Sequence, residues 1–208
     1  MNKNSEHKLV SDELFNAMTA DRKVRIAITR ESHWYFFGFY FAHYIKFATA
    51  NFQRKLIALT ENESIQNLFV VAFRGSGKST LITTSYVLWS ILGKQQKKFV
   101  LILGQTRAQT KQHMMNIKRE LEANELLRND LGPFNEEKDE WGAVSLVFSY
   151  HNARITVAST EQGVRGLRHD QYRPDLIIGD DVEDGNSTKT REGRDKTYEW
   201  LTGEVIPA

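Results

Sequence analysis

The stretch NLFVVAFRGSGKST, from Asn67 to Thr80, ends in glycines, a lysine and hydroxyls whose spacing suits phosphate binding. Such a loop needs glycines so that backbone N–H groups can approach a phosphate, a lysine that reaches the outer phosphates, and a hydroxyl that holds magnesium. We therefore expect a loop that binds ATP together with Mg²⁺. Its nucleotide-contacting residues would be Arg74, Gly75, Ser76, Gly77, Lys78, Ser79 and Thr80.

The flanking sequence favours this interpretation over a flexible surface turn of similar composition. An apolar run precedes the loop and a helical pattern begins at its lysine, which is the context that the motif requires. The common pattern G-x-x-x-x-G-K-[ST] places glycine where this chain has Ala72, so the loop is a variant. In it, the guanidinium of Arg74 could lie near the β- and γ-phosphates, or it could be a solvated loop charge.

Two carboxylates follow the apolar run LIIG near the C-terminal end of the chain. Nucleotide hydrolysis needs a carboxylate that holds the metal and another that activates water. We assign the metal to Ser79 and Asp180 and the water to Asp181, with Glu183 as the reserve base. An acidic surface loop and a two-metal nuclease site are the alternatives, but a buried strand that ends in two acids favours the ATPase interpretation.

The surrounding pattern predicts an α/β fold. Continuous apolar runs predict buried strands at 67–73 and 98–104, and the helix expected between them, 78–92 with Gly93 in a left-handed conformation after it, would complete a βαβ unit. Thr106 and Gln109 form a capping box before a helix whose buried stripe is Met114, Ile117 and Leu121. Further elements are expected as a hairpin of strands at 145–150 and 153–159, a strand at 174–181 and a helix at 191–201.

The N-terminal part has helical patterns. The segment 11–50 is expected to be helical, with Ser11 as the cap, and the aromatic-rich segment 33–52 is expected to be a buried helix rather than one lying on a membrane. A short helix should end near Asn62. The apolar positions proposed for these helices are Leu14, Met18, Val24, Ile28, Phe52, Leu56 and Leu59.

Composition limits the class of protein. The 208 residues suit one globular domain, which we divide into an N-terminal helical subdomain at 1–50 and an ATPase domain at 51–208. The net charge of +2 gives no strong attraction to polyanions, and the absence of cysteine excludes disulfides and thiolate metal sites. No segment has the composition of a signal peptide or membrane span, so a soluble protein is expected.

Several longer motifs resemble the ATPase domain of the large terminase subunit of tailed bacteriophages, the motor that packages DNA. They are FRGSGKST, EQGVRGLRHDQYRPDLIIGDDVED and REGRDKTYEWLTGEVIPA. The resemblance covers nearly the whole chain. It implies a three-layer αβα P-loop NTPase fold of the additional-strand, RecA-like type, with a mostly parallel central sheet and an N-terminal helical extension.

The same resemblance implies roles and partners. Arg74 would be the arginine of the phosphate loop, and Arg165 would reach into a neighbouring subunit's site to neutralise transition-state charge. Gln53 would contact adenine, although a plain amphipathic helix also explains its segment. Implied partners are double-stranded DNA, further copies in a homo-oligomeric ring, a portal protein and a small terminase subunit, in the cytoplasm of the host cell and without a membrane.

Departures from the family keep other functions open. The coupling strand and nuclease domain that usually follow are expected to be absent from this chain, so no DNA cleavage is expected. Another P-loop translocase or helicase would share every site residue, and a nucleotide-binding assembly module without turnover is the non-enzymatic alternative. Lysines at 97, 98, 111 and 118 could reach DNA or serve only solubility.

Overall fold

The structure, a computed structural model, describes residues 20–134, 141–160, 162–183 and 185–208. Its four-stranded sheet has the order β2-β3-β1-β4. β1 is parallel to β3 and β4, and β2 is antiparallel to β3. The strands are β1 (Phe99–Gly104), β2 (Ser145–Phe148), β3 (Ala153–Ser159) and β4 (Leu176–Gly179). The expected α/β class is therefore confirmed, with a mixed open sheet.

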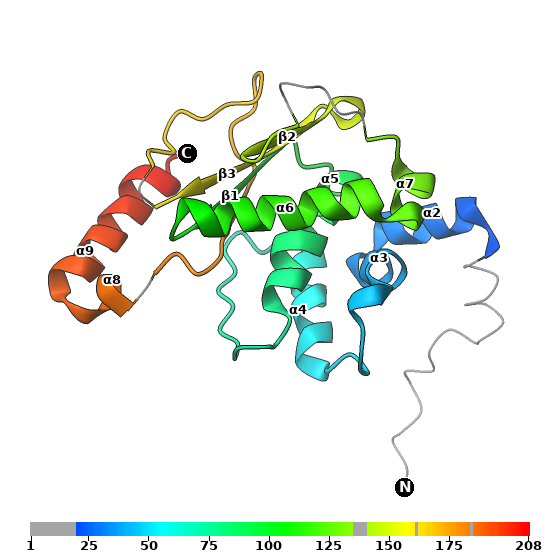
Figure 1. Cartoon of the computed structure of the whole chain (residues 1–208), viewed down its shortest axis with the longest axis horizontal. Coiled ribbons are helices and arrows are strands. Elements are labelled where there is room, and N and C mark those ends of the chain that lie inside the picture. The colour runs from blue at the N-terminus through cyan, green and yellow to red at the C-terminus, as the bar shows by residue number, and fades with distance from the viewer. Residues whose placement is uncertain (1–19, 135–140, 161, 184) are drawn as a thin grey trace, which may run out of the picture.

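In the view of Figure 1, most helices lie below this sheet and towards its two ends. The helices are α2 (Arg22–Glu31), α3 (His33–Tyr40), α4 (Asn51–Glu61), a π-helix η2 (Thr80–Tyr86), α5 (Val87–Leu92), α6 (Arg107–Ala123), α7 (Glu125–Leu131), α8 (Gly185–Lys189), α9 (Arg191–Trp200) and a second π-helix, η4 (Leu201–Val205). Two 3₁₀ turns, η1 (Ala42–Tyr44) and η3 (Ser149–His151), complete the elements. Among the described helices, none is long and apolar enough to cross a bilayer.

The strand predicted at 98–104 is confirmed, and its unbroken apolar sequence has a clear cause. Val100 and Ile102 belong to a large core that includes side chains of α3, α4, α5 and α6. Leu101 and Leu103 face the other side, where they pack in a smaller core with Val205. Because side chains alternate between the faces of a strand, a sheet covered on both faces needs apolar residues at consecutive positions.

The strand predicted at 67–73 is wrong. These residues have no regular secondary structure, and Phe69, Val71 and Phe73 are 87%, 100% and 68% exposed. Leu68 and Val70 line a pocket of about 350 Å³ together with residues of β4, so a cavity and not a paired backbone lies along this segment. Without a neighbouring backbone a ladder cannot form. The predicted βαβ unit therefore lacks its first strand.

The helix predicted at 78–92 is present, although its first part is unusual. The chain is helical from Lys78 to Leu92, with the π-helix η2 preceding α5. Gly93 is not left-handed as expected, because its φ is −88°. Glycine is needed there for another reason: a Cβ would lie 2.6 Å from the Trp89 carbonyl oxygen.

Other local predictions are confirmed. Thr106 and Gln109 form the expected capping box of α6, whose buried positions include the predicted Met114, Ile117 and Leu121. The hairpin is the antiparallel pair β2–β3, and it turns through η3 and Asn152, whose φ is 45°. The last predicted strand and helix are β4 and α9.

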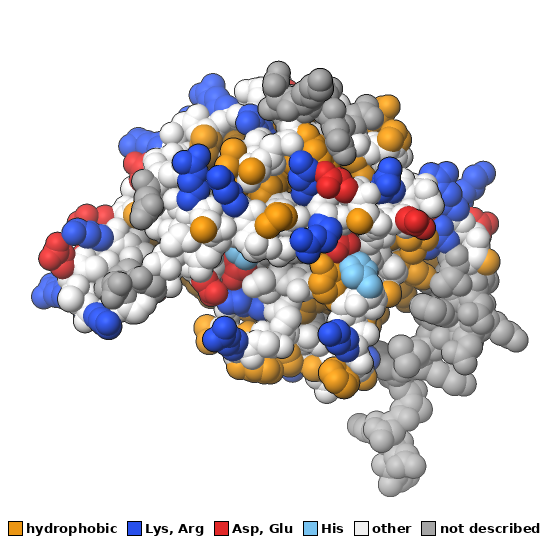
Figure 2. All heavy atoms as spheres, in the orientation of Figure 1, with side chains coloured by type: hydrophobic (Ala, Val, Ile, Leu, Met, Phe, Trp, Pro, Cys, Tyr) orange, Lys and Arg blue, Asp and Glu red, His pale blue; other side chains and the backbone are white. Residues whose placement is uncertain are grey.

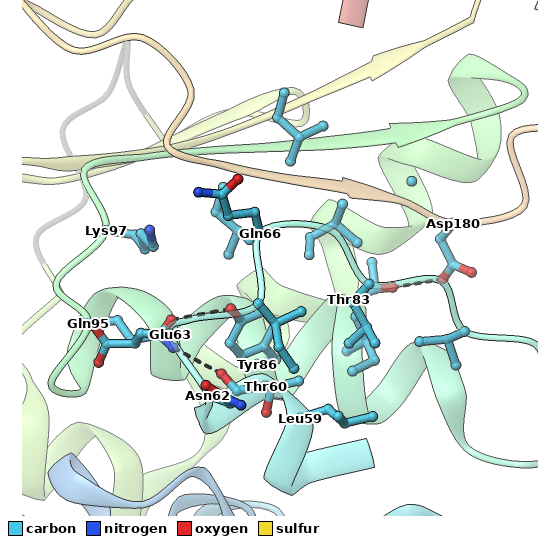
Figure 3. Close-up of a pocket in the computed structure, with 18 of the residues that line it drawn as sticks. Leu59, Thr60, Asn62, Glu63, Gln66, Thr83, Tyr86, Gln95, Lys97 and Asp180 are labelled. Atoms are coloured by element: carbon cyan, nitrogen blue, oxygen red, sulfur yellow. Dashed lines mark hydrogen bonds between the residues drawn. The ribbon is translucent and has the colours of Figure 1, made fainter. Parts of the chain in front are cut away.

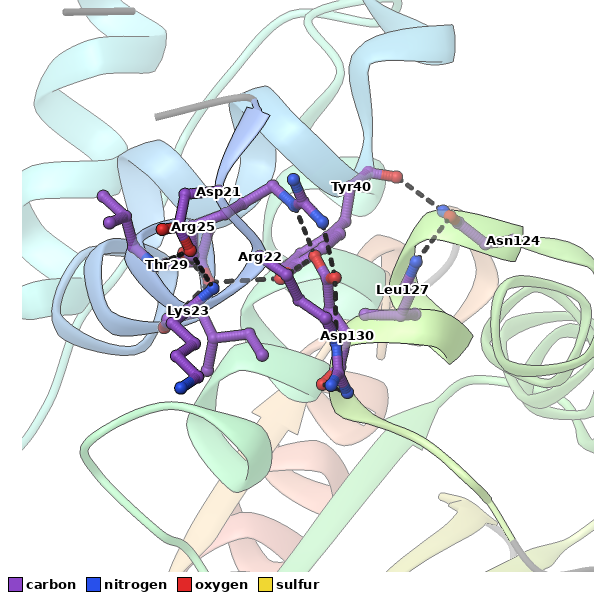
Figure 4. A network of polar contacts seen from close by, with 11 residues as sticks. Asp21, Arg22, Lys23, Arg25, Thr29, Tyr40, Asn124, Leu127 and Asp130 are labelled. Atoms are coloured by element: carbon purple, nitrogen blue, oxygen red, sulfur yellow. Dashed lines mark hydrogen bonds and ion pairs between the residues drawn. The ribbon is translucent and has the colours of Figure 1, made fainter. Parts of the chain in front are cut away.

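The N-terminal helices bury polar as well as apolar groups. Ser11, Leu14 and Met18 lie outside the described residues. On α2, Val24 was expected to be a buried apolar position, but it is 40% exposed. The buried residues of this helix are Thr29 and Arg25, and the guanidinium of Arg25 donates two hydrogen bonds to the Asp130 carboxylate of α7 (Figure 4). This hydrogen-bonded partner raises the pKa of Arg25. A charged pair thus joins the first described helix to the rest of the molecule.

Helices α3 and α4 are attached to the helix that follows the phosphate loop. The buried helix predicted at 33–52 is confirmed only over α3, with Phe36 and Tyr40 in the core. Residues 45–50 are not helical, and Phe47 is 87% exposed. His33 is fully buried, with Nδ1 2.7 Å from Thr60 Oγ1 of α4 and Nε2 3.0 Å from Ser85 Oγ of η2. Burial lowers the pKa of His33 to about 3, so the imidazole is neutral. On α4, only Leu56 of the three predicted apolar positions is buried.

Candidate functional site

The glycine-rich segment forms a tight loop whose conformation requires glycine. Gly75 and Gly77 have φ values of 83° and 78°, in the left-handed region that other residues avoid. The loop is closed by a hydrogen bond from Ser76 N to Phe73 O, and the helix starts with one from Leu81 N to Gly77 O. The loop therefore leads directly into a helix N-terminus, an arrangement that favours anions.

The side-chain amide of Gln53, on α4, holds this loop through a hydrogen bond. Its Nε2 donates to the Ser76 carbonyl at 2.8 Å, while its Oε1 accepts from Ala50 N at 3.0 Å, at the N-terminus of α4. The amide predicted to read adenine thus has both ends bonded within the protein. A Cβ at Gly77 would lie 3.3 Å from Gln53 Nε2, so this packing also favours glycine at position 77.

The two predicted acids follow β4, and the fold brings them to the loop. Lys78 Nζ lies 3.6 Å from Asp180 Oδ1 and 3.3 Å from Asp181 Oδ1. The side chain of Asp180 is 5% exposed and that of Asp181 71% exposed. Asp181 also has a left-handed φ of 48°, which directs the chain away from the sheet. Asp180 is therefore a buried acid next to Lys78, whereas the side chain of Asp181 is open to solvent beside the same lysine.

The buried carboxylate has polar neighbours on more than one side. Thr83 of η2 donates a hydrogen bond to Asp180 Oδ2 at 2.7 Å (Figure 3). His113 of α6 places Nε2 3.8 Å from the same oxygen. Because an unpaired buried carboxylate is costly, these contacts and Lys78 explain how Asp180 is accommodated.

The remaining predicted residues occupy different positions. Ser79 and Thr80 lie half-buried in the first turn after Lys78, while Arg74 and Glu183 are exposed. Arg165 is exposed as well, and its backbone N–H donates to Glu204 Oε2 at 3.3 Å. Among the interactions of the described residues, none joins the Arg165 side chain to the phosphate loop. The structure brings Lys78, Asp180 and Asp181 together, whereas both arginines are exposed to solvent.

The pocket beside this site extends along the open edge of β4. Its lining includes Lys78, Thr83 and Asp180 at the loop end and Tyr86 and Lys97 further along (Figure 3). No cluster of at least three His, Asp or Glu side chains suited to a metal occurs among the described residues. Magnesium rarely uses such a cage, since it keeps several waters and binds through one or two carboxylates and substrate phosphates. A hydroxyl at Ser79 and a carboxylate at Asp180 fit that habit.

Thr83 and His113 were not identified from the sequence. Thr83 lies one helical turn after Ser79, and His113 lies on the helix capped by Thr106. The helix face on which each residue lies could therefore be inferred from the neighbouring sequence. Their shared partner, Asp180, is distant in the chain. Only the packing of η2 and α6 beside the end of β4 identifies them.

On the face shown in Figure 2, basic side chains do not form one continuous patch that would suit DNA. Figure 2 shows Lys and Arg side chains spread over the visible face, with acidic and hydrophobic side chains between them. Lys118 Nζ, on α6, donates a hydrogen bond to the Trp141 carbonyl oxygen and lies 3.6 Å from Glu122 Oε1. The face therefore gives no separate support to nucleic-acid binding.

Comparison with known proteins gives no family. No protein-family model matches the chain, and no curated protein matches it significantly. The geometry of the loop, its lysine and the acids after β4 is therefore the basis for inferring a function.

Proposed function

We propose that this protein is a Mg²⁺-dependent ATP hydrolase of the three-layer, additional-strand P-loop type. The observation that carries the proposal is the distance of 3.6 Å between Lys78 Nζ and Asp180 Oδ1, at the mouth of a loop with two left-handed glycines. A lysine and an acid from distant segments meet there beside a helix N-terminus. This is the combination that triphosphate binding requires.

The residues present fit Mg²⁺-ATP. Backbone N–H groups between Gly75 and Lys78 would bind phosphate oxygens, and the Lys78 amine would turn from the acids toward the outer phosphates. Ser79 and Asp180 would hold the magnesium ion, which when bound would neutralise phosphate charge. The two acids beside Lys78 keep that amine at the site before the nucleotide arrives.

Asp181 is the better candidate than Glu183 for the water-activating acid. Its Oδ1 lies 3.3 Å from Lys78 Nζ, and its side chain is open to solvent. Asp180 is too buried for that role and is better placed to hold the metal. Glu183 is exposed and has no recorded contact with this group of side chains.

We further propose that the hydrolysis drives packaging of double-stranded DNA, as in the terminases that the motifs resemble. Support comes from the sequence motifs around Arg74, Arg165 and Asp180. In this proposal copies of the chain form a ring, Arg165 completes a neighbour's site, and a portal protein and a small terminase subunit are the further partners. The exposure of Arg165 leaves its side chain accessible to another copy.

The test is ATP hydrolysis by the wild type, Lys78→Ala and Asp181→Ala, with and without double-stranded DNA. Lys23→Ala is a matched control, because Lys23 is an exposed lysine on α2. Hydrolysis that DNA stimulates and that only the two site variants lose is the expected result. Equal rates in all four proteins would refute hydrolysis at this site. Binding of ATP without hydrolysis would favour the nucleotide-binding assembly module. A hydrolysis rate that double-stranded DNA does not change would refute the packaging motor.

A further inference from the structure

Thr83 is a buried hydroxyl with a charged partner. It is 1% exposed on η2, one turn beyond Ser79, and donates to Asp180 Oδ2 at 2.7 Å. Hydrogen bonds to ionised acceptors are roughly twice as strong as neutral ones. This bond therefore connects the helix that follows the phosphate loop to the end of β4.

His113 approaches the same carboxylate oxygen from another element. Its Nε2 lies 3.8 Å from Asp180 Oδ2, and its side chain is 18% exposed. The N-terminal half of α6 reaches this position because Gly104 ends β1: a Cβ there would lie 2.9 Å from Thr110 Cγ2. The close packing of α6 on β1 thus places an imidazole beside Asp180.

The two oxygens of Asp180 consequently have different surroundings. Oδ2 faces Thr83 and His113, whereas Oδ1 faces Lys78 at 3.6 Å. A carboxylate held through one oxygen has a fixed orientation, and its other oxygen points to the phosphate loop. Figure 3 shows Thr83 and Asp180 joined in this way beside the pocket.

We propose that Thr83, supported by His113, is a positioning residue that fixes Asp180 so that Oδ1 is presented to the magnesium ion. This inference rests on the proposed function, because it concerns the same metal site. Partners that orient a metal ligand typically contribute about 10- to 100-fold to metal affinity or activity. The hydroxyl of Thr83, rather than its bulk, is the group that does so.

The test compares Thr83→Val, which keeps the shape and removes the donor, with Thr83→Ser, which keeps the donor. Thr84→Val is the matched control, since Thr84 is a neighbouring buried threonine that is 5% exposed and makes no recorded side-chain hydrogen bond. The readout is the Mg²⁺ concentration that gives half-maximal binding of a fluorescent ATP analogue. Thermal unfolding verifies that each variant is folded.

Thr83→Val should raise this Mg²⁺ concentration about tenfold or more. Thr83→Ser should restore it, and Thr84→Val should leave it unchanged. Equal Mg²⁺ dependence in Thr83→Val and wild type would overturn the inference. So would a Thr83→Ser variant as impaired as Thr83→Val, because the role would then be steric.

A second measurement separates this inference from the proposed function. Crystal structures of nucleotide-free wild type and Thr83→Val show the Asp180 rotamer without any activity. The inference predicts that Oδ1 leaves Lys78 in the variant. An unchanged carboxylate would overturn it, whether or not the wild type hydrolyses ATP. Failure of the wild type to bind Mg²⁺-ATP would instead refute the proposed function.

Discussion

Lys78 Nζ and Asp180 Oδ1 lie 3.6 Å apart, although one residue opens a helix near the middle of the chain and the other follows the edge strand β4. The contact depends on two features of the chain. Glycines at 75 and 77 allow the loop to turn into the helix, and β4 pairs with β1 so that its end reaches the same edge of the sheet. The first of these features can be tested by substitution.

The loop conformation should not tolerate a side chain at Gly77. Gly77→Ala introduces a Cβ at a φ of 78°, 3.3 Å from Gln53 Nε2, so we expect a loss of about 1 kcal/mol in unfolding free energy. ATP-analogue binding should weaken as well. Gly38→Ala is the control: Gly38 lies in α3 with open space around its Cβ position, so alanine should be neutral or stabilising. Urea denaturation of both variants measures the difference, and equal stability would refute the loop argument.

Asp181→Asn should separate binding from turnover. Asparagine tolerates a left-handed φ and keeps the side-chain shape, so the fold and ATP affinity should be little changed. Loss of the carboxylate should lower the hydrolysis rate about 100-fold or more if Asp181 activates water. Glu183→Gln serves as the comparison. Normal turnover in Asp181→Asn together with a slow Glu183→Gln would transfer the role to Glu183.

The Arg25–Asp130 pair should be important for stability. The Asp130 side chain is fully buried and Arg25 is nearly so, and Asp130→Ala would remove the carboxylate that accepts two hydrogen bonds from the buried guanidinium. We expect a loss of about 3 kcal/mol in unfolding free energy. Asp195→Ala breaks the exposed Arg191–Asp195 pair and should cost less than about 0.5 kcal/mol. Comparable losses in these two variants, measured by chemical denaturation, would contradict the burial argument.

His33 should make stability depend on pH. Its pKa is lowered to about 3 in the fold, from 6.5. Below pH 6.5, His33 therefore binds a proton in the unfolded chain but not in the folded protein. The corresponding part of the unfolding free energy is present above pH 6.5 and is lost as the pH falls toward 3. The expected slope is about 1.4 kcal/mol per pH unit. His33→Gln should lower stability at pH 7 but show a shallower loss between pH 6.5 and 4.5, and parallel profiles for both proteins would refute it.

Local signals in the sequence predicted much of the fold. Thr106 and Gln109 cap α6 through contacts within a single turn, so their role could be predicted from their spacing. β1 could be predicted because its consecutive apolar residues match burial on both faces. The same signal at 67–73 gave a wrong strand, because strand formation also needs a neighbouring backbone that composition does not reveal.

The candidate site was also predicted from the sequence only in part. The sequence predicted that Lys78, Asp180 and Asp181 lie close together, since a glycine-rich loop and acids that follow a buried strand are typical parts of one nucleotide site. The contacts of Thr83 and His113 with Asp180 join three different elements and leave no local pattern. Likewise, the buried partner of Arg25 lies on α7, and periodicity on α2 pointed to Val24 instead.

The most direct test of the central claim is a crystal structure with Mg²⁺ and a non-hydrolysable ATP analogue. We predict that the γ-phosphate lies within hydrogen-bonding distance of Lys78 Nζ, with the magnesium ion between Ser79 Oγ and Asp180 Oδ1. A nucleotide bound elsewhere, or Lys78 still paired with both acids beside an empty loop at saturating analogue, would contradict it.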